Sequence, residues 1–168
     1  SKNKVSNVKA LDNVSFEVFE GESFGLVGES GSGKSTIAKI ISSLIHPSSG
    51  EIYFDNISLF DPKNKEIKNK FRGQIQMIFQ DPYSSLNPRF KVKNIIAEPI
   101  KFFQKNIDEA NISKNINDLI DIVGMSRQSL ERYPHEFSGG QRQRISIARA
   151  LALSLIHISE PTRLHGIS

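Results

Sequence analysis

The chain has 168 residues, enough for one domain with a hydrophobic core and too few for two full domains. Apolar residues make up 38% of it and charged residues 24%, which excludes a disordered or fibrous protein, and the lack of cysteine excludes disulfides and Cys-ligated zinc. No stretch approaches the ~20 apolar residues of a membrane span, and the net charge of +4 comes from scattered side chains. We therefore expect a cytoplasmic protein that does not cross a membrane alone.

The first half of the chain is predicted to alternate strands with a helix. Residues 14–19 alternate apolar and polar positions and residues 24–27 form an apolar run between glycines, so both are predicted strands. A predicted helix follows Gly33 and ends before H-P-S-S-G at 46–50; its apolar positions are Ile37, Ile40, Ile41 and Leu44. Residues 51–54 and 57–60 are predicted to form a hairpin, and residues 74–79 a further strand.

The second half is predicted to be mainly helical. A polar, proline-containing stretch at 81–89 marks the change and is predicted to be an exposed loop. Ser113 is the expected N-cap of the next helix and Gly124 its expected end. One face of that helix carries Ile116, Leu119, Ile120 and Val123.

A glycine-rich segment between the second predicted strand and the first predicted helix fits G-x-x-x-x-G-K-[ST], in the context that this phosphate-binding motif requires. Glycines let several backbone N–H groups and the positive end of a helix dipole point at one anion. Lys34 is expected to bridge the terminal phosphates, Ser35 to bind Mg²⁺, and Thr36 to donate to a phosphate. The alternative is a flexible turn with a surface lysine. The predicted ATP-binding residues are Gly28, Glu29, Ser30, Gly31, Ser32, Gly33, Lys34, Ser35 and Thr36.

The segment F-S-G-G-Q-R-Q-R at 137–144 supplies a second predicted anion site. Ser138 can cap the helix that follows, whose one face carries Ile145, Ala148 and Ala152, and two glycines permit close approach of a phosphate. The segment resembles the signature sequence of ABC ATPases, in which each signature faces the ATP held by the other subunit. The resemblance implies that Ser138, Gly139, Gly140 and Gln141 contact nucleotide in a dimer; a simple capped turn is the alternative.

The segment Q-M-I-F-Q-D-P at 76–82 resembles the glutamine loop of the same family. The resemblance implies that Gln80 contacts the metal and the attacking water, and that the loop after it abuts a transmembrane partner. The implied catalytic residues are then Lys34 and Gln80, and the implied metal ligands are Ser35 and Gln80. An ordinary polar strand end is the alternative for Gln80.

Two longer strings, I-F-Q-D-P-Y-S-S-L-N-P-R and Y-P-H-E-F-S-G-G-Q-R-Q-R, resemble the ABC subfamily that energises oligopeptide and dipeptide importers. In that context Tyr83 and Leu86 are candidate contacts with a membrane subunit, or parts of a packed turn. The resemblance covers residues from about 8 to 153. It implies an α/β P-loop NTPase (RecA-like) core with an antiparallel β portion and a helical subdomain at about 92–138, incomplete at the C-terminus.

The resemblance also implies an ATPase that uses ATP and Mg²⁺ and works at the cytoplasmic face of a bacterial membrane. Its implied partners are a second ATPase subunit, identical or different, transmembrane permease subunits and, indirectly, a solute-binding protein. No nucleic acid is expected. Two alternatives remain: a soluble ABC ATPase that acts on nucleic acid or ribosomes, and a nucleotide-binding remnant that does not hydrolyse ATP.

After A-L-A-L at 150–153 the chain departs from the family. Where the family has D-E-P-T-S-A-L-D, alignment of Glu160 places Ser159 at the aspartate position. The string L-S-L-I-H-I-S-E-P-T-R at 153–163 resembles the translation of a transposon-type adapter used for DNA sequencing libraries. We expect residues 1–153 to be a partial nucleotide-binding domain from a longer reading frame, 154–168 to be foreign to the family, and the chain alone to be poorly stable.

Overall fold

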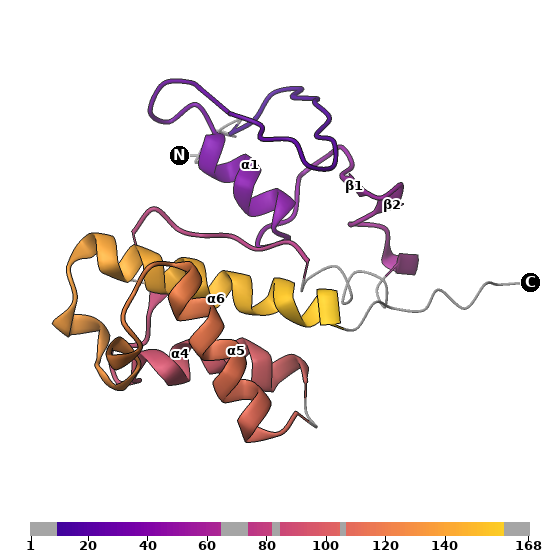
Figure 1. The fold of residues 1–168 in the computed structure, drawn as a ribbon. Coiled ribbons are helices and arrows are strands. Elements are labelled where there is room, and N and C mark those ends of the chain that lie inside the picture. The colour runs from indigo at the N-terminus through magenta and orange to yellow at the C-terminus, as the bar shows by residue number, and fades with distance from the viewer. Residues whose placement is uncertain (1–9, 65–73, 82–84, 105–106, 160–168) are drawn as a thin grey trace, which may run out of the picture. The chain divides into compact units, whose positions relative to one another are not determined.

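The computed structural model describes residues 10–64, 74–81, 85–104 and 107–159, without the side chains of 64 and 154–159. The chain divides into two compact units, Ser1–Lys68 and Asn69–Ser168. Among the described residues no helix is both long and apolar enough to span a membrane. Figure 1 shows the elements in chain order.

In the part of the first unit that the structure describes, there are one α-helix and one short hairpin (Figure 1). Helix α1 runs over Lys34–Ile41, so the predicted helix is confirmed, although Leu44 lies beyond its end. Strands β1 (Tyr53–Phe54) and β2 (Ile57–Ser58) are antiparallel, and the 3-10 helix η1 (Pro62–Asn64) follows. The turn residues Asp55 and Asn56 have φ of 47° and 61°, a left-handed conformation that these two residue types tolerate in a tight hairpin.

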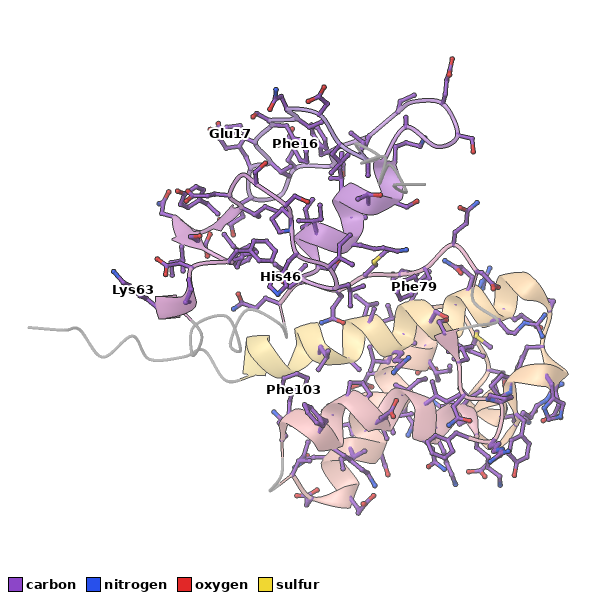
Figure 2. All side chains as sticks on the ribbon, turned by 180° about the vertical axis from the view of Figure 1, so that it is seen from behind. Phe16, Glu17, His46, Lys63, Phe79 and Phe103 are labelled. Atoms are coloured by element: carbon purple, nitrogen blue, oxygen red, sulfur yellow. The ribbon has the colours of Figure 1, made fainter. Side chains whose placement is uncertain are left out.

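Three predicted strands are absent from the described structure: residues 14–19, 24–27 and 74–79 are irregular. A strand needs a neighbour for its N–H and C=O groups, and only the β1–β2 pair forms a ladder among the described residues. The apolar side chains of the first two segments therefore stay largely exposed, Val27 at 95% and Phe19 at 70%. The rings of Phe16 (Figure 2) and Phe24 stack at 5.0 Å. The low stability expected for the chain alone stays a prediction.

Among its described residues the second unit has three α-helices, α4 (Val92–Phe103), α5 (Glu109–Ile122) and α6 (Gly139–Ser159). Two 3-10 helices, η2 (Arg127–Glu131) and η3 (Pro134–Glu136), join α5 to α6. The three α-helices pack together (Figure 1) and share one apolar core. The predicted inner face of α6 is confirmed, since Ile145, Ala148 and Ala152 are at most 1% exposed.

The start of α5 differs from the prediction. Its N-cap is Asp108, whose carboxylate accepts the backbone N–H of Asn111 at 2.7 Å, while Ser113 lies inside the helix. The apolar face begins one turn earlier than predicted, at the buried Ile112, so a cap upstream of it is needed. The predicted end is confirmed: Gly124 follows the last turn with φ of 66°, and its N–H donates to the carbonyl of Asp121.

Candidate nucleotide-binding site

The phosphate-loop segment turns into α1 through two left-handed glycines. Gly31 has φ of 84° and Gly33, the N-cap of α1, has φ of 95°. A Cβ atom on Gly33 would lie 2.6 Å from the carbonyl oxygen of Ala10 and 2.6 Å from a methyl carbon of Leu11. Only glycine fits this position, because both the backbone angle and the space exclude a side chain.

The loop encloses the ammonium group of Lys34. Its Nζ donates to the carbonyl oxygens of Gly28, at 2.7 Å, and Glu29, and to the hydroxyl of Ser32 at 3.1 Å. A Cβ atom on Gly28 would lie 2.8 Å from the Ser32 hydroxyl and 4.0 Å from Nζ, so the absence of a side chain keeps this concavity open. The segment from Gly28 to Lys34 therefore forms a cradle with one positive charge at its centre.

The start of α1 presents backbone hydrogen-bond donors of the kind that bind a phosphate group. The first N–H groups of a helix have no acceptor within the helix, so those of Lys34, Ser35 and Thr36 are available at the start of α1, whose first turn carries no acidic residue. Ser35 is exposed and offers a hydroxyl oxygen to a hard cation. Among the described residues no cluster of three His, Cys, Asp or Glu side chains could hold a metal by itself. A Mg²⁺ ion here would thus need phosphate oxygens as further ligands.

The signature segment caps α6 through two reciprocal hydrogen bonds. The Ser138 hydroxyl accepts the N–H of Gln141 at 3.3 Å, and the Gln141 side-chain oxygen accepts the N–H of Ser138 at 3.0 Å. The predicted cap by Ser138 is confirmed. The return bond from Gln141 was missed, although the spacing S-x-x-Q is typical of a capping box. A Cβ atom on Gly139 or Gly140 would meet nothing within 4 Å, so the space beside this helix end is open.

The turn before the signature is held by Glu136. Its carboxylate accepts the N–H of Tyr133 at 2.6 Å and pairs with Arg132, whose guanidinium lies over the ring of the buried Phe137. The hydrogen bond from the Tyr133 N–H, helped by Arg132 and by the charge of His135, lowers the pKa of Glu136. These contacts fix the entry to the signature, and they were not predicted from the sequence.

Gln80 is exposed and lies at a bend that ends the irregular stretch 74–81. The loop after it is only partly described, and Tyr83 lies outside the described residues. Leu86 is 4% exposed and belongs to the core of the second unit, so it is a packed-turn residue and its candidate contact with a membrane subunit is wrong. The predicted exposed loop is thus buried at this position.

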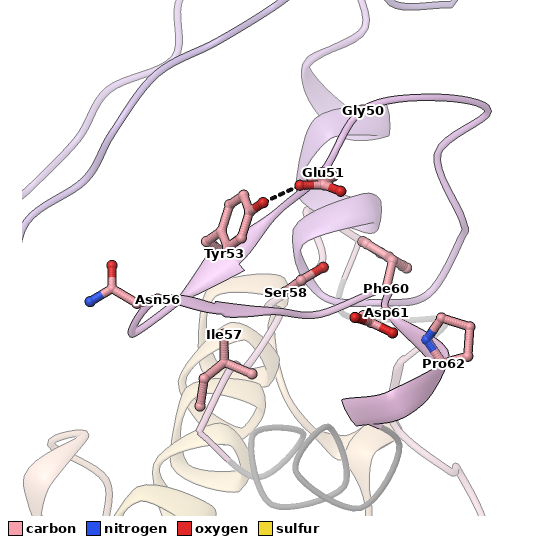
Figure 3. A pocket seen from close by; sticks show the side chains of 9 residues that line it. All are labelled: Gly50, Glu51, Tyr53, Asn56, Ile57, Ser58, Phe60, Asp61 and Pro62. Atoms are coloured by element: carbon pink, nitrogen blue, oxygen red, sulfur yellow. Dashed lines mark hydrogen bonds between the residues drawn. The ribbon is translucent and has the colours of Figure 1, made fainter.

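The predicted site residues fall into both units of the chain. Residues 28–36 lie in the first, while Gln80 and residues 138–141 lie in the second. A separate pocket of about 650 Å³ lies beside the β1–β2 hairpin, lined by residues between Gly50 and Pro62 (Figure 3). None of the predicted site residues lines it. Helix α6 continues to Ser159, and Glu160 lies outside the described residues.

The chain belongs to the ABC transporter family, whose model matches residues 11–162. It is 53% identical to the oligopeptide transport ATP-binding protein OppF of Streptococcus mutans over 153 residues, 91% of this chain and 49% of that protein. It is 47% identical to the dipeptide transport ATP-binding protein DppF of Lactococcus lactis subsp. cremoris over 155 residues, again 91% and 49%. The chain therefore spans about half the length of the curated relatives it matches.

Solved structures support the same assignment. The dimeric MJ0796 cassette of a bacterial ABC transporter matches with a TM-score of 0.75 and 34% identity, over 86% of this chain and 62% of that one. The same cassette in a post-hydrolysis state, bound to ADP and Pi, matches with a TM-score of 0.73 and 33% identity over the same shares. The predicted P-loop NTPase fold class is thereby confirmed, although the three strands named above are not formed in the described residues.

Proposed function

We propose that the protein to which this chain belongs binds ATP with Mg²⁺ and hydrolyses it to energise an importer of oligopeptides or dipeptides. The observation that carries the proposal is the enclosure of the Lys34 ammonium by the loop at the open start of α1. The names of the relatives, oligopeptide and dipeptide transport ATP-binding proteins, support the substrate class.

In the proposed reaction the loop exchanges its contacts on Lys34 for contacts with phosphate. The ammonium and the N–H groups of Lys34, Ser35 and Thr36 then offset the charge that develops on the transferred phosphoryl group. Bound Mg²⁺ would neutralise phosphate oxygens, with Ser35 and Gln80 as the protein ligands. The Gln80 amide would orient the attacking water without adding charge.

The proposed partners follow from the signature. Ser138, Gly139, Gly140 and Gln141 present an open helix N-terminus, which suits a phosphate held by a second ATPase subunit. The MJ0796 cassette is dimeric, which supports a pair of such domains. We place this pair at the cytoplasmic face of the membrane, against permease subunits that receive substrate from a solute-binding protein.

The experiment is ATP-dependent uptake of a labelled peptide into vesicles that carry the full-length ATPase, its permease and its solute-binding protein. We expect uptake and ATP hydrolysis together, and loss of both with Lys34→Ala. Hydrolysis stimulated by nucleic acid or ribosomes, without permease association, would favour the soluble alternative. ATP binding with no hydrolysis in the complete complex would favour the remnant.

We also propose the domain division predicted from the sequence, with residues 1–153 as family sequence and 154–168 as foreign, although the family model matches as far as residue 162. Resequencing of the source gene beyond the codon of Ala152, from a library made without transposon adapters, tests this division. Recovery of D-E-P-T-S-A-L-D in place of the present tail is the expected result. Recovery of the present codons would make the tail native and overturn the division.

A further inference from the structure

Arg132 lies where η2 ends and the turn that leads to the signature begins. Its backbone carbonyl accepts the N–H of Val92 at 2.9 Å. Val92 is the first residue of α4 and is fully buried, so its N–H has no acceptor within its own helix and needs one from outside. The neighbouring Glu131 pairs with Lys91 at 3.0 Å and with Lys93 at 2.6 Å. Arg132 is therefore fixed to the start of α4 through its backbone.

The side chain of Arg132 contacts the other end of the turn. Its Nη2 donates to the backbone carbonyl of Glu136 at 2.8 Å, and its Nε donates to the Glu136 carboxylate at 3.3 Å. The guanidinium carbon lies 4.6 Å from the centre of the Phe137 ring, which belongs to the apolar core of the unit. The planar guanidinium thus meets a carbonyl, a carboxylate and a ring face together, which a lysine ammonium cannot do.

The turn between Arg132 and the signature is too short to hold its own shape. Helix η3 has three residues, and it is closed by hydrogen bonds from the N–H of Glu136 to the carbonyl of Tyr133, at 3.0 Å, and from the N–H of Phe137 to the carbonyl of Pro134, at 3.2 Å. A 3-10 helix of this length has poor hydrogen-bond geometry. The contact of Arg132 with Glu136 therefore connects the end of this turn to the start of α4.

This contact bears on the signature because Ser138 follows the turn directly and caps α6. Of the two residues before it, Phe137 is anchored in the core and Glu136 is held by Arg132. The ion pair between Arg132 and Glu136 is partly exposed, at 47% and 36%, so it adds little to stability. Its effect is geometric, since it sets the direction in which the chain enters α6 and hence the position of the signature.

We infer that Arg132 is a positioning residue, which fixes the signature relative to the start of α4. This inference rests on the proposed function, in which Ser138 meets the nucleotide held by a second ATPase subunit. Arg132 contacts neither ATP nor metal in this role. Its loss should weaken the nucleotide-driven dimer and leave ATP binding by a single subunit unchanged, because the phosphate-loop residues 28–36 belong to the other unit of the chain.

The test uses the full-length ATPase and the second ATPase subunit of its pair. The variants are Arg132→Gln, Arg132→Lys, Glu136→Gln and the double variant with Gln at both positions. The matched control is Arg127→Gln, which removes an exposed arginine that pairs with Asp121 on α5. The structural readout is hydrogen exchange at the N–H groups of Glu136 and Phe137, which close η3. The functional readouts are the Kd of a single subunit for ATP and the Kd of the dimer with a non-hydrolysable ATP analogue.

We expect Arg132→Gln to speed exchange at these two amides and to leave exchange in α4, α5 and α6 unchanged. It should weaken the dimer about tenfold at constant ATP affinity of the single subunit. Arg132→Lys should restore part of the dimer affinity, since an ammonium can meet the Glu136 carboxylate or its carbonyl but not both. The double variant should lose no more than Arg132→Gln alone, because both changes remove the same contact. Arg127→Gln should match the wild type.

Unchanged exchange at Glu136 and Phe137 would overturn the inference, as would faster exchange throughout the three helices. Losses that multiply in the double variant would also overturn it, because Arg132 would then act on the dimer independently of Glu136. Weaker ATP binding by the single subunit would have the same meaning. If the wild-type subunits form no dimer with nucleotide, the proposed function fails, and hydrogen exchange in the free subunit still decides whether Arg132 fixes the turn.

Discussion

Ser138 and Gln141 cap α6 reciprocally, each side chain accepting the backbone N–H of the other, at 3.3 Å and 3.0 Å. We expect Ser138→Ala to lower the free energy of unfolding by about 1 kcal/mol, because the Gln141 N–H loses its acceptor. Urea denaturation of the full-length protein measures this. The control is Ser113→Ala inside α5, which should raise stability by up to ~0.5 kcal/mol, since alanine favours helix more than serine. Equal losses of unfolding free energy in both variants would show that the Ser138 cap does not stabilise α6.

A substitution at Gly140 should change dimer formation without lowering the stability of the fold. A Cβ atom there meets nothing within 4 Å, and alanine in a helix is favoured over glycine by ~0.5–1 kcal/mol, so Gly140→Ala should not destabilise the protein. It should nevertheless weaken nucleotide-driven dimerisation, because the methyl group occupies the space proposed for the partner's phosphate. Sedimentation velocity with a non-hydrolysable ATP analogue measures the dimer. Unchanged dimerisation would contradict the proposed arrangement, in which the signature of one subunit faces the nucleotide held by the other.

Gly33 and Gly31 form a matched pair in the phosphate loop. Both have positive φ, so alanine costs ~1–2 kcal/mol of backbone energy at either position. Only at Gly33 does the added Cβ also meet a backbone carbonyl, that of Ala10, at 2.6 Å. We expect titration calorimetry to show lost ATP binding for Gly33→Ala and a milder loss for Gly31→Ala. The reverse order would mean that close packing does not shape this loop.

Lys34 should carry the electrostatic part of nucleotide affinity. Loss of a hydrogen bond to a charged group costs ~1.5–3 kcal/mol, so Lys34→Met should weaken ATP binding by about ten- to a hundredfold. The control is Lys39→Met in the last turn of the same helix, which removes the same charge away from the loop. Fluorescence titration with a labelled nucleotide compares the two. Similar losses would point to the general positive charge of α1 and not to the cradle.

Glu136 gives the turn before the signature an acid sensitivity. Its pKa is lowered first by the hydrogen bond from the Tyr133 N–H and then by Arg132. The contribution of Glu136 to folding stability is therefore present above the ordinary glutamate pKa of about 4.3, and it is lost as the pH falls through the lowered pKa. We expect an NMR titration to place the Glu136 midpoint below that ordinary value. Glu136→Gln should remove this acid-dependent change in the Ser138 amide shift. A midpoint at or above the ordinary value would contradict the Tyr133 contact.

The helical half of the chain was predicted well in its elements and less well in its boundaries. Helices α5 and α6 have apolar faces that repeat at helical spacing, which a sequence displays directly. Ser113 is the predicted N-cap because it directly precedes the recognised apolar face, which starts at Ile116, whereas the helix is capped by Asp108. The buried Ile112 shows which of them is correct, and burial is a property of the packed unit.

The sequence by itself determined the features that depend on neighbouring residues: the glycine turn into α1, the Asp55–Asn56 hairpin, the cap at Ser138 and the family to which they belong. Only the tertiary structure decided that residues 14–19, 24–27 and 74–79 form no strands, that Leu86 is buried, and that Arg149 holds Ser85 and Glu98, which lie 64 and 51 residues away. A cap or a tight turn satisfies its hydrogen bonds within a few residues. A strand or a guanidinium fork needs partners distant in sequence, and only the folded chain determines which of them are present.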